Sequence, residues 1–313
     1  MTQTARVCPM RPLHGLLLLL AACAATPPER FKSERPGANT KEQGELIKRA
    51  MGLYWNGGEE YEDVIEQCGK DPEAAQTLAM LMVIKMSDTE QLQRRKQANK
   101  FQIRTLEQNI PYTRARGTIV KLGKNAMPII EELVRHPHSD KRRRGVEILS
   151  RMPESVLPIV EKKFAACPAK YRRHYIEAVA QMEPVPASEL MLLEWAKHED
   201  YALRATALAG LASFGDRNLA LLRDAVQKDP DQFVQRQVVR YLGHFRDRET
   251  AAVVVAFYAR SAQRGDRHGI REAERTLVKM SKSAPTKRGR LIHYGLAHWQ
   301  KWVLTLPVGG GDR

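Results

Sequence analysis

The sequence has few of the residues on which catalytic and metal sites depend. It contains 4 cysteines and 9 histidines in 313 residues, and no histidine stands at metal-ligand spacing from a cysteine or a carboxylate. The H-E-x-x-H, G-x-S-x-G, Walker and G-x-G-x-x-G motifs do not occur. The closest histidine pair, His136 and His138, fits a polar turn better than a metal site. We therefore expect no enzyme, no cofactor and no metal.

Long hydrophobic runs are also missing, apart from one near the N-terminus. The run from Leu13 to Ala22 is about ten residues long, whereas a membrane-spanning helix needs roughly twenty. Arg6 and Arg11 precede this run, and residues 1–22 contain no acidic residue. A short apolar run behind a basic start is typical of a secretory signal. We therefore expect residues 1–22 to be a signal peptide.

The end of this apolar run carries a processing motif. Leu20-Ala21-Ala22-Cys23 resembles the lipobox of bacterial lipoproteins. The resemblance implies cleavage before Cys23 and acylation of that cysteine, and two or three acyl chains such as palmitate form a stable membrane anchor. The next residue is Ala24 rather than an aspartate, which in such lipoproteins favours the outer membrane, facing the periplasm. The alternatives are an ordinary cleavable signal and a helix buried in the fold.

The chain that follows residue 22 has the composition of an all-helical protein. Leu, Ala, Arg, Lys and Glu dominate its 291 residues, and the alternation of β-branched residues typical of strands is scarce. Its net charge is +13, compared with +15 for the whole chain. Cys68 and Cys167 do not indicate a disulfide framework, because they fall in segments that the repeats described below place apart. Two buried thiols are favoured over a disulfide.

Apolar residues recur with a period near thirty-one. Five segments align on their last apolar residue at spacings of 30, 30, 32 and 31, and each has a second apolar residue three positions earlier. Apolar side chains at this spacing form a stripe along one side of a helix. Each segment is therefore predicted to be a helix with one apolar face. The two columns are Leu122, Met152, Met182, Phe214 and Phe245, and Ile119, Leu149, Val179, Leu211 and Leu242.

A second helix is predicted to follow each of these helices. Pro128 and Pro158 stand thirty residues apart near the first helical turn, where a missing N–H costs nothing. A helix pair of about thirty residues cannot bury its apolar face alone, and stacking against neighbouring pairs buries it. The sequence therefore predicts an all-α fold: a right-handed α-solenoid of about five to six helix–turn–helix repeats.

One unit resembles a known repeat family. The stretch DYALRATALAGLASFGDRNLALLRDAV, residues 200–226, is similar to a HEAT repeat, and the resemblance extends over about residues 110–262. Asp200 and Arg204 match positions whose side chains commonly form a hydrogen-bonded ladder along the inner helices of HEAT proteins. The resemblance implies HEAT-like repeats, and it makes Asp200 and Arg204 structural rather than catalytic.

The segments that flank the repeats are less regular. Pro, Gly and charge dominate the segment after Cys23, which predicts a flexible tether. A basic helix is expected within residues 90–108, and Trp299 and Trp302 are expected to cover the C-terminal end of the array. The predicted parts are a signal peptide (1–22), a lipidated cysteine and tether (23–41), an N-terminal helical region (42–108), a HEAT-like repeat domain with a Trp cap (109–305) and a flexible tail (306–313).

Positive charge is the remaining feature of the sequence. Basic clusters at 141–144 and 170–173 open successive repeats at equivalent positions, so they should align on one face of the solenoid and attract acidic partners. The alternative is a solvated, salt-screened surface. The candidate partner-binding residues are Arg142, Arg143, Arg172, Arg173 and Arg204.

Together these features predict a membrane-tethered, non-enzymatic scaffold in the bacterial cell envelope that binds one or more other envelope proteins. The alternative function is binding of an anionic envelope polymer or lipid head group through the basic face. Charge alone would also permit nucleic-acid binding. We expect no nucleic-acid partner, because export would remove the protein from that ligand.

Overall fold

The architecture was established from a computed structural model, which describes residues 40–98, 110–281, 286–287, 290–291 and 294–306. From residue 110 onward the described chain forms six successive helix pairs, which confirms the predicted all-α solenoid. The pairs are α5 (Ile110–Lys121) with α6 (Met127–Val134), α7 (Ser139–Leu149) with α8 (Leu157–Ala166), α9 (Ala169–Ala180) with α10 (Pro186–Trp195), α11 (Tyr201–Leu211) with α12 (Leu219–Lys228), α13 (Gln232–Leu242) with α14 (Arg248–Gln263), and α15 (Arg267–Ser281) with α16 (Leu296–Leu304).

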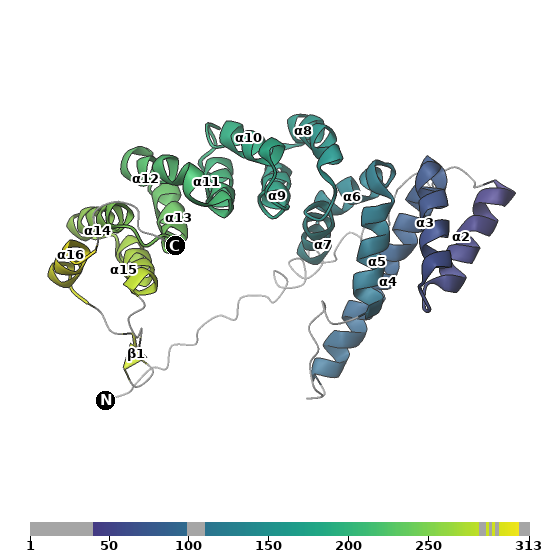
Figure 1. Ribbon diagram of the computed structural model, residues 1–313, viewed down its shortest axis with the longest axis horizontal. Helices are drawn as coiled ribbons and strands as arrows, with labels where there is room; N and C mark the ends of the chain where they lie inside the picture. The colour runs from purple at the N-terminus through teal and green to yellow at the C-terminus, as the bar shows by residue number, and fades with distance from the viewer. Residues whose placement is uncertain (1–39, 99–109, 282–285, 288–289, 292–293, 307–313) are drawn as a thin grey trace, which may run out of the picture.

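The stacked pairs bend into an arch (Figure 1). Helices α7, α9, α11, α13 and α15 lie on the inner side of the arch, and α8, α10, α12 and α14 lie on its outer side. Consecutive inner helices pack directly on one another, as α9 does on α11 and α11 on α13. We use the term inner face for the solvent-facing surface of α7, α9, α11, α13 and α15.

The apolar columns predicted from the repeat period form the core. All ten residues of the two columns are buried, from Ile119 in α5 and Leu122 directly after it to Leu242 at the end of α13 and Phe245 in the turn that follows. A fully buried side chain of this kind contributes roughly 1.5–3 kcal/mol relative to an exposed one. The core is therefore continuous along the array, and no single helix pair closes it.

Local sequence signals fix where many of these helices begin. Pro128 and Pro158 occupy the first turns of α6 and α8, as predicted. Asp200 begins α11, because its carboxylate accepts hydrogen bonds from the backbone N–H groups of Ala202 and Leu203. Asp231 caps α13 in the same way. Side-chain oxygens at these positions satisfy backbone donors that the first helical turn leaves open.

Two glycines allow the inner helices to approach their neighbours closely. A Cβ atom on Gly145 of α7 would lie 2.7 Å from the backbone nitrogen of Val134 at the end of α6. A Cβ atom on Gly210 of α11 would lie 2.5 Å from the Cβ of Ala180 in α9. Both distances are shorter than van der Waals contact, so the stacking distance itself depends on glycine at these positions.

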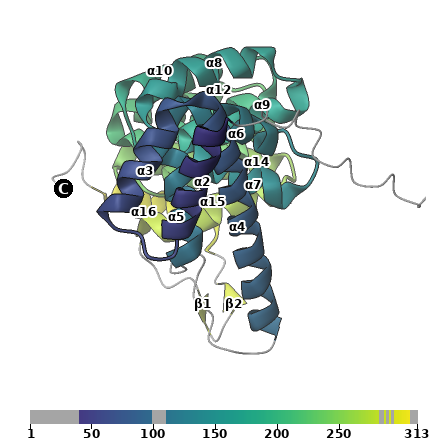
Figure 2. The same cartoon turned by 90° about the vertical axis from the view of Figure 1, so that its right-hand side faces the viewer.

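Among the described residues, three helices precede the array: α2 (Lys41–Leu53), α3 (Glu59–Lys70) and α4 (Pro72–Ala98). Thr40 and Gln43 form a capping box that starts α2 one residue inside the segment expected to be a tether. Helix α4 is continuous over 27 residues and includes the first part of the basic helix expected within residues 90–108; residues 99–108 of that prediction lie outside the described residues. Helix α4 packs against α5, and its C-terminal end extends away from the array (Figures 1 and 2).

The C-terminal end of the array is partly covered by α16. Trp299 is fully buried and Trp302 half-buried where α16 packs on α14. The segment before α16, expected to be a basic loop, contains two short antiparallel strands, β1 (Thr286–Lys287) and β2 (Arg290–Leu291). Thr286 pairs with Leu291, and Lys287 pairs with Arg290.

Other expectations concern the cysteines and the membrane. Cys68 and Cys167 are free and buried, as the sequence favoured. Within the described helices, none is both long and apolar enough to cross a membrane. The signal peptide, Cys23 and most of the tether and tail lie outside the described residues, so these predictions stay predictions.

Candidate functional site: the inner face of the helical array

The recurrent basic position at the start of the inner helices has an internal role. Arg142 donates hydrogen bonds to the backbone carbonyls of His136 and Pro137, which form the turn before α7. Arg172 donates to the carbonyl of Cys167, and Arg204 donates to those of His198 and Glu199. Each side chain thus folds back on carbonyl groups of the turn that precedes its own helix.

Arg204 also makes an ion pair, but its partner is not Asp200, the aspartate that the HEAT-like pattern singled out. Its guanidinium lies 2.7 and 3.0 Å from the two carboxylate oxygens of Asp229, and both side chains are largely buried. Asp200 and Asp231 cap helices instead of pairing with Arg204. Gln235 takes the place of the arginine in the next unit and donates to the carbonyl of Asp229. Asp229 therefore links Arg204 of α11 with Gln235 of α13 along the inner helices.

The arginines that follow this position in α7 are held by α4. Glu90 accepts hydrogen bonds from Arg144 at 2.6 and 2.8 Å and from Arg143 at 3.0 Å. Arg144 and Glu90 are buried, while the side chain of Arg143 remains 51% exposed. Hydrogen bonds between charged groups are strong, and a buried charge needs its partners, so this carboxylate fixes the position of α4 relative to the two arginines. Arg143 and Arg144 of this cluster thus fasten α7 to α4.

In the matching cluster of α9, Arg173 has a carboxylate partner on its own helix. Arg173 pairs with Glu177 at 2.8 Å, and Nδ1 of His174 lies 3.0 Å from the same carboxylate. Burial alone would raise the pKa of Glu177, but the hydrogen bond from His174 and the charge of Arg173 outweigh it, and the pKa is lowered. Arg143 and Arg173 still face the inner side, each with a carboxylate partner.

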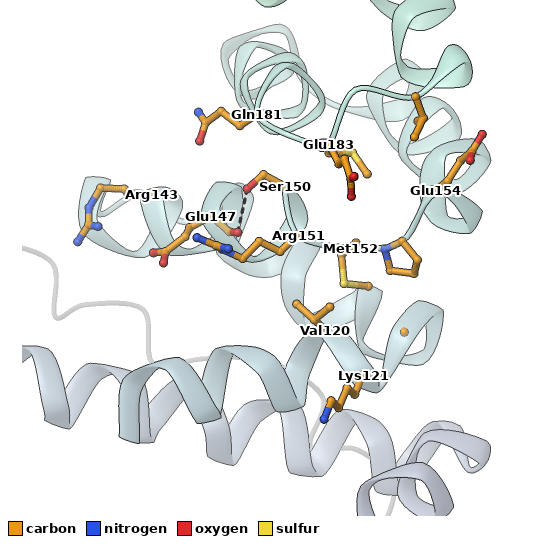
Figure 3. A pocket seen from close by; sticks show the side chains of 14 residues that line it. Val120, Lys121, Arg143, Glu147, Ser150, Arg151, Met152, Glu154, Gln181 and Glu183 are labelled. Atoms are coloured by element: carbon orange, nitrogen blue, oxygen red, sulfur yellow. Dashed lines mark hydrogen bonds between the residues drawn. The ribbon is translucent and has the colours of Figure 1, made fainter. Parts of the chain in front are cut away.

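A groove lies on the inner face where α5, α7 and α9 come together (Figure 3). It consists of two adjoining cavities of about 960 Å³ and about 510 Å³, which share the lining residues Arg143, Glu147 and Gln181. The larger cavity extends along the C-terminal ends of these helices to the turns after Met152 and Met182. We call these two cavities together the α7–α9 groove.

The floor of the α7–α9 groove is electrostatically satisfied. Glu147 accepts a hydrogen bond from the hydroxyl of Tyr112 at 2.8 Å and pairs with Arg116 of α5 at 2.5 Å. Burial, reinforced by Glu147, raises the pKa of Tyr112, so this hydroxyl keeps its proton. Met152 and Val185 add apolar surface to the wall.

The rim of the groove carries carboxylates that are available to a ligand. Glu154 follows the end of α7 and Glu183 follows the end of α9, and both line the larger cavity (Figure 3). Both are exposed, and neither makes a hydrogen bond or ion pair with another described residue. Neither was predicted from the sequence, although Met152 and Met182 stand thirty residues apart and a glutamate follows each within two residues.

The two histidines of the turn before α7 were the closest histidine pair in the sequence. Across the described residues, no group of three or more His, Cys, Asp and Glu side chains is placed to hold a metal ion. His136 and His138 stack on each other in the turn before α7, with ring centroids 5.3 Å apart. The backbone N–H of His138 donates to Nδ1 of His136, which fits the polar turn expected from the sequence.

Comparison with known proteins yields one match. A family model described as HEAT repeats matches residues 189–273, which include α11, α12, α13 and α14. Neither the curated proteins nor the solved structures contain a match to this chain. The matched segment includes the unit at 200–226 that carried the resemblance in the sequence, and its helix pairs continue into those on either side. The chain therefore carries a HEAT-like helical-repeat domain.

Proposed function

We propose that this protein is a non-enzymatic scaffold, anchored to the bacterial outer membrane through acyl chains on Cys23, that binds another envelope protein along its inner face. Helical repeat arrays are suited to protein interaction because they present a long curved surface. The lipobox-like sequence supports the anchor, and its sorting position, Ala24, supports the outer membrane.

The α7–α9 groove is the observation that carries the interaction. It consists of two adjoining cavities with polar and apolar lining residues, and Glu147 at its floor already has its partners, so a bound segment need not break that ion pair. Glu154 and Glu183 at its rim lack internal partners among the described residues. Charge complementarity therefore favours a partner segment with lysine or arginine side chains at this point.

The alternative function, binding of an anionic polymer or lipid through a basic face, has less support. Of the five arginines on which it depends, Arg142, Arg172 and Arg204 donate to backbone carbonyls. Arg143 and Arg173 each have a carboxylate partner. An anionic ligand at this position would compete with bonds that the fold already makes.

Photo-crosslinking in the native host tests the interaction. A photoreactive amino acid is placed at Gln181, which lines both cavities of the groove, and at Glu161, which is exposed on the outer helix α8. We expect one discrete protein adduct from Gln181 and none from Glu161. Equal adducts from both positions, or none from Gln181, would contradict docking at the inner face.

The anchor is tested separately in the same cells. Metabolic labelling with an alkyne palmitate analogue should label the wild-type chain, and Cys23→Ser should abolish the label and release the chain from the membrane fraction. Membrane association of an unlabelled chain would reject the anchor without affecting the interaction result.

A further inference from the structure

A second surface of the inner face, not singled out by the sequence analysis, is formed by α13 and α15. Arg236 and Arg240 lie one turn apart on the solvent side of α13, and the exposed His244 follows in the turn after this helix. Arg271, Arg275 and Lys279 follow one another at helical spacing on the solvent side of α15. Contacts between the two helices join the rows, since Arg240 reaches Glu272 at 3.1 Å and Lys279 Nζ lies 2.8 Å from His244 Nε2. We call this surface the α13–α15 ridge.

Positive charge exceeds negative charge on the α13–α15 ridge. Glu272 is shared by Arg240 at 3.1 Å and Arg275 at 2.9 Å, and Asp266 faces Arg236 at 3.4 Å. Lys279 has a histidine as its neighbour, and Arg271 is exposed with no hydrogen bond or ion pair to another described residue. Three arginines thus share two carboxylates, while Arg271 and Lys279 have none. This arrangement leaves an excess of cations for a ligand.

An aromatic pair borders the ridge on the side of α11. Phe233 lies two helical turns before Arg240 on the same side of α13. Its ring packs edge-on against Tyr201 of α11, with centroids 5.5 Å apart, and Tyr201 is 49% exposed. An exposed aromatic ring beside a row of arginines is a common feature of protein-binding surfaces.

We propose that the α13–α15 ridge binds an acidic, extended segment of the partner protein, with an apolar side chain of that segment against Tyr201 and Phe233. Arginine forks match carboxylates in a bidentate geometry. The proposal rests on the scaffold function above and adds the chemistry of the bound segment. Together with the carboxylates at the rim of the α7–α9 groove, the ridge defines the direction in which the partner lies along the inner face. Basic residues of the partner lie near α9, and acidic residues lie near α15.

Two other anionic partners fit the ridge less well. A lipid bilayer is flat, whereas the ridge lies on the inner side of a curved array (Figure 1). A nucleic acid carries uniform negative charge, which Asp266 and Glu272 within the ridge would repel. A peptide also offers N–H donors for those two carboxylates, so a polypeptide is the occupant we infer.

Fluorescence anisotropy with defined peptides tests the proposal on the full chain in a neutral detergent. The probe is a fluorescein-labelled peptide with one phenylalanine followed by glutamates, and the reference probe has glutamines instead. We expect the glutamate peptide to bind at least about tenfold more tightly than the glutamine peptide, with affinity falling as NaCl rises. The double variant Arg240→Glu/Arg275→Glu should weaken binding by about tenfold or more.

Matched controls separate ridge binding from a general charge effect. Lys48→Glu/Lys162→Glu makes the same change in net charge on α2 and α8, far from the ridge, and should leave the affinity within about twofold. Charge reversal at Arg240 and Arg275 places like charges beside Glu272 and could therefore disturb the fold. A second variant, Arg271→Glu, avoids this problem because it breaks no internal bond among the described residues. It should weaken binding severalfold with an unchanged circular dichroism melting curve.

Several results would overturn the proposal. These are equal binding of the two peptides, equal weakening by the control variant, or tighter ridge-dependent binding of oligothymidylate or of phosphatidylglycerol vesicles. If the glutamate peptide does not bind while the photoreactive residue at position 181 still crosslinks a partner, the ridge assignment is wrong and the scaffold function stands. If Gln181 gives no adduct while the peptide binds as expected, docking in the groove is wrong and the ridge still binds acidic peptides.

Discussion

The two halves of the inner face use arginine in opposite ways. Around α7 and α9 the arginines of the two basic clusters are engaged by turn carbonyls, Glu90 and Glu177, and the charged groups of the groove without a partner among the described residues are the two carboxylates of its rim. Around α13 and α15 the arginines face solvent and outnumber their carboxylate partners. In the first half the arginines hold helices and turns together, and in the second half an excess of cations remains for a ligand.

This difference shows that a dense basic run in a sequence does not define a basic surface. Arg142, Arg143 and Arg144 are consecutive, but in a helix consecutive residues point in different directions. One caps a turn, one is half-exposed beside Glu90, and one is buried with the same carboxylate. Arginines spaced by about one turn, as in α13 and α15, instead gather on a single side.

The largest expected effect concerns the ion pair that fastens α7 to α4. Glu90→Ala leaves Arg144 buried without a carboxylate, and removal of one partner of a buried pair typically costs about 3–5 kcal/mol. Urea denaturation should show a loss of this size in the free energy of unfolding. The control Glu183→Ala, at an exposed position, should change it by less than about 0.5 kcal/mol. Similar losses in the two variants would contradict the structural role of the first basic cluster.

A smaller effect distinguishes two arginines at equivalent positions of the repeat. Arg204→Gln leaves the largely buried Asp229 without its ion pair, so we expect a loss of about 1–3 kcal/mol in the free energy of unfolding. Arg172→Gln keeps a donor for the turn carbonyl, as Gln235 does naturally, and should cost less than about 1 kcal/mol. Thermal denaturation of both variants checks the order, and the reverse order would disprove the pairing with Asp229.

The turn before α7 should make stability depend on pH. Burial, together with the charge of Lys141 and other nearby groups, lowers the pKa of His136 to about 4 from its ordinary value near 6.5. Between these values the unfolded chain binds a proton that the folded chain does not, so stability falls as the pH drops from about 6.5 to about 4. Because His136 is partly exposed, we expect about 1–2 kcal/mol. His136→Gln should remove that part of the pH dependence, and an unchanged profile would refute it.

The smallest expected effect lies in the second half of the inner face. Arg271→Gln removes one charge from a cluster of cations and breaks no bond among the described residues. The free energy of unfolding should stay within about 0.5 kcal/mol of wild type. A clear loss of stability would mean that the ridge is structural, as the arginines of α7 are.

The sequence predicted the repeat architecture because its signals are local. Columns such as Met152 and Leu149, and helix starts such as Pro128, depend on residues within one helix pair. The site depended on contacts between distant residues. Glu90 and Arg144 are 54 positions apart. Arg204 pairs with Asp229 and not with Asp200, the aspartate expected from the family pattern. Which arginine is exposed is decided by such pairings, and the repeat period does not contain that information.

Crosslinking from both halves of the inner face, with mass spectrometry of the attached peptides, tests the central claim most directly. Photoreactive residues at Gln181 in the groove and at Gln237 on α13 should capture two segments of the same partner protein. The account predicts a basic segment at Gln181 and an acidic segment at Gln237. Segments of the same charge at both positions, or adducts of equal yield from Glu161 on the outer side, would contradict it.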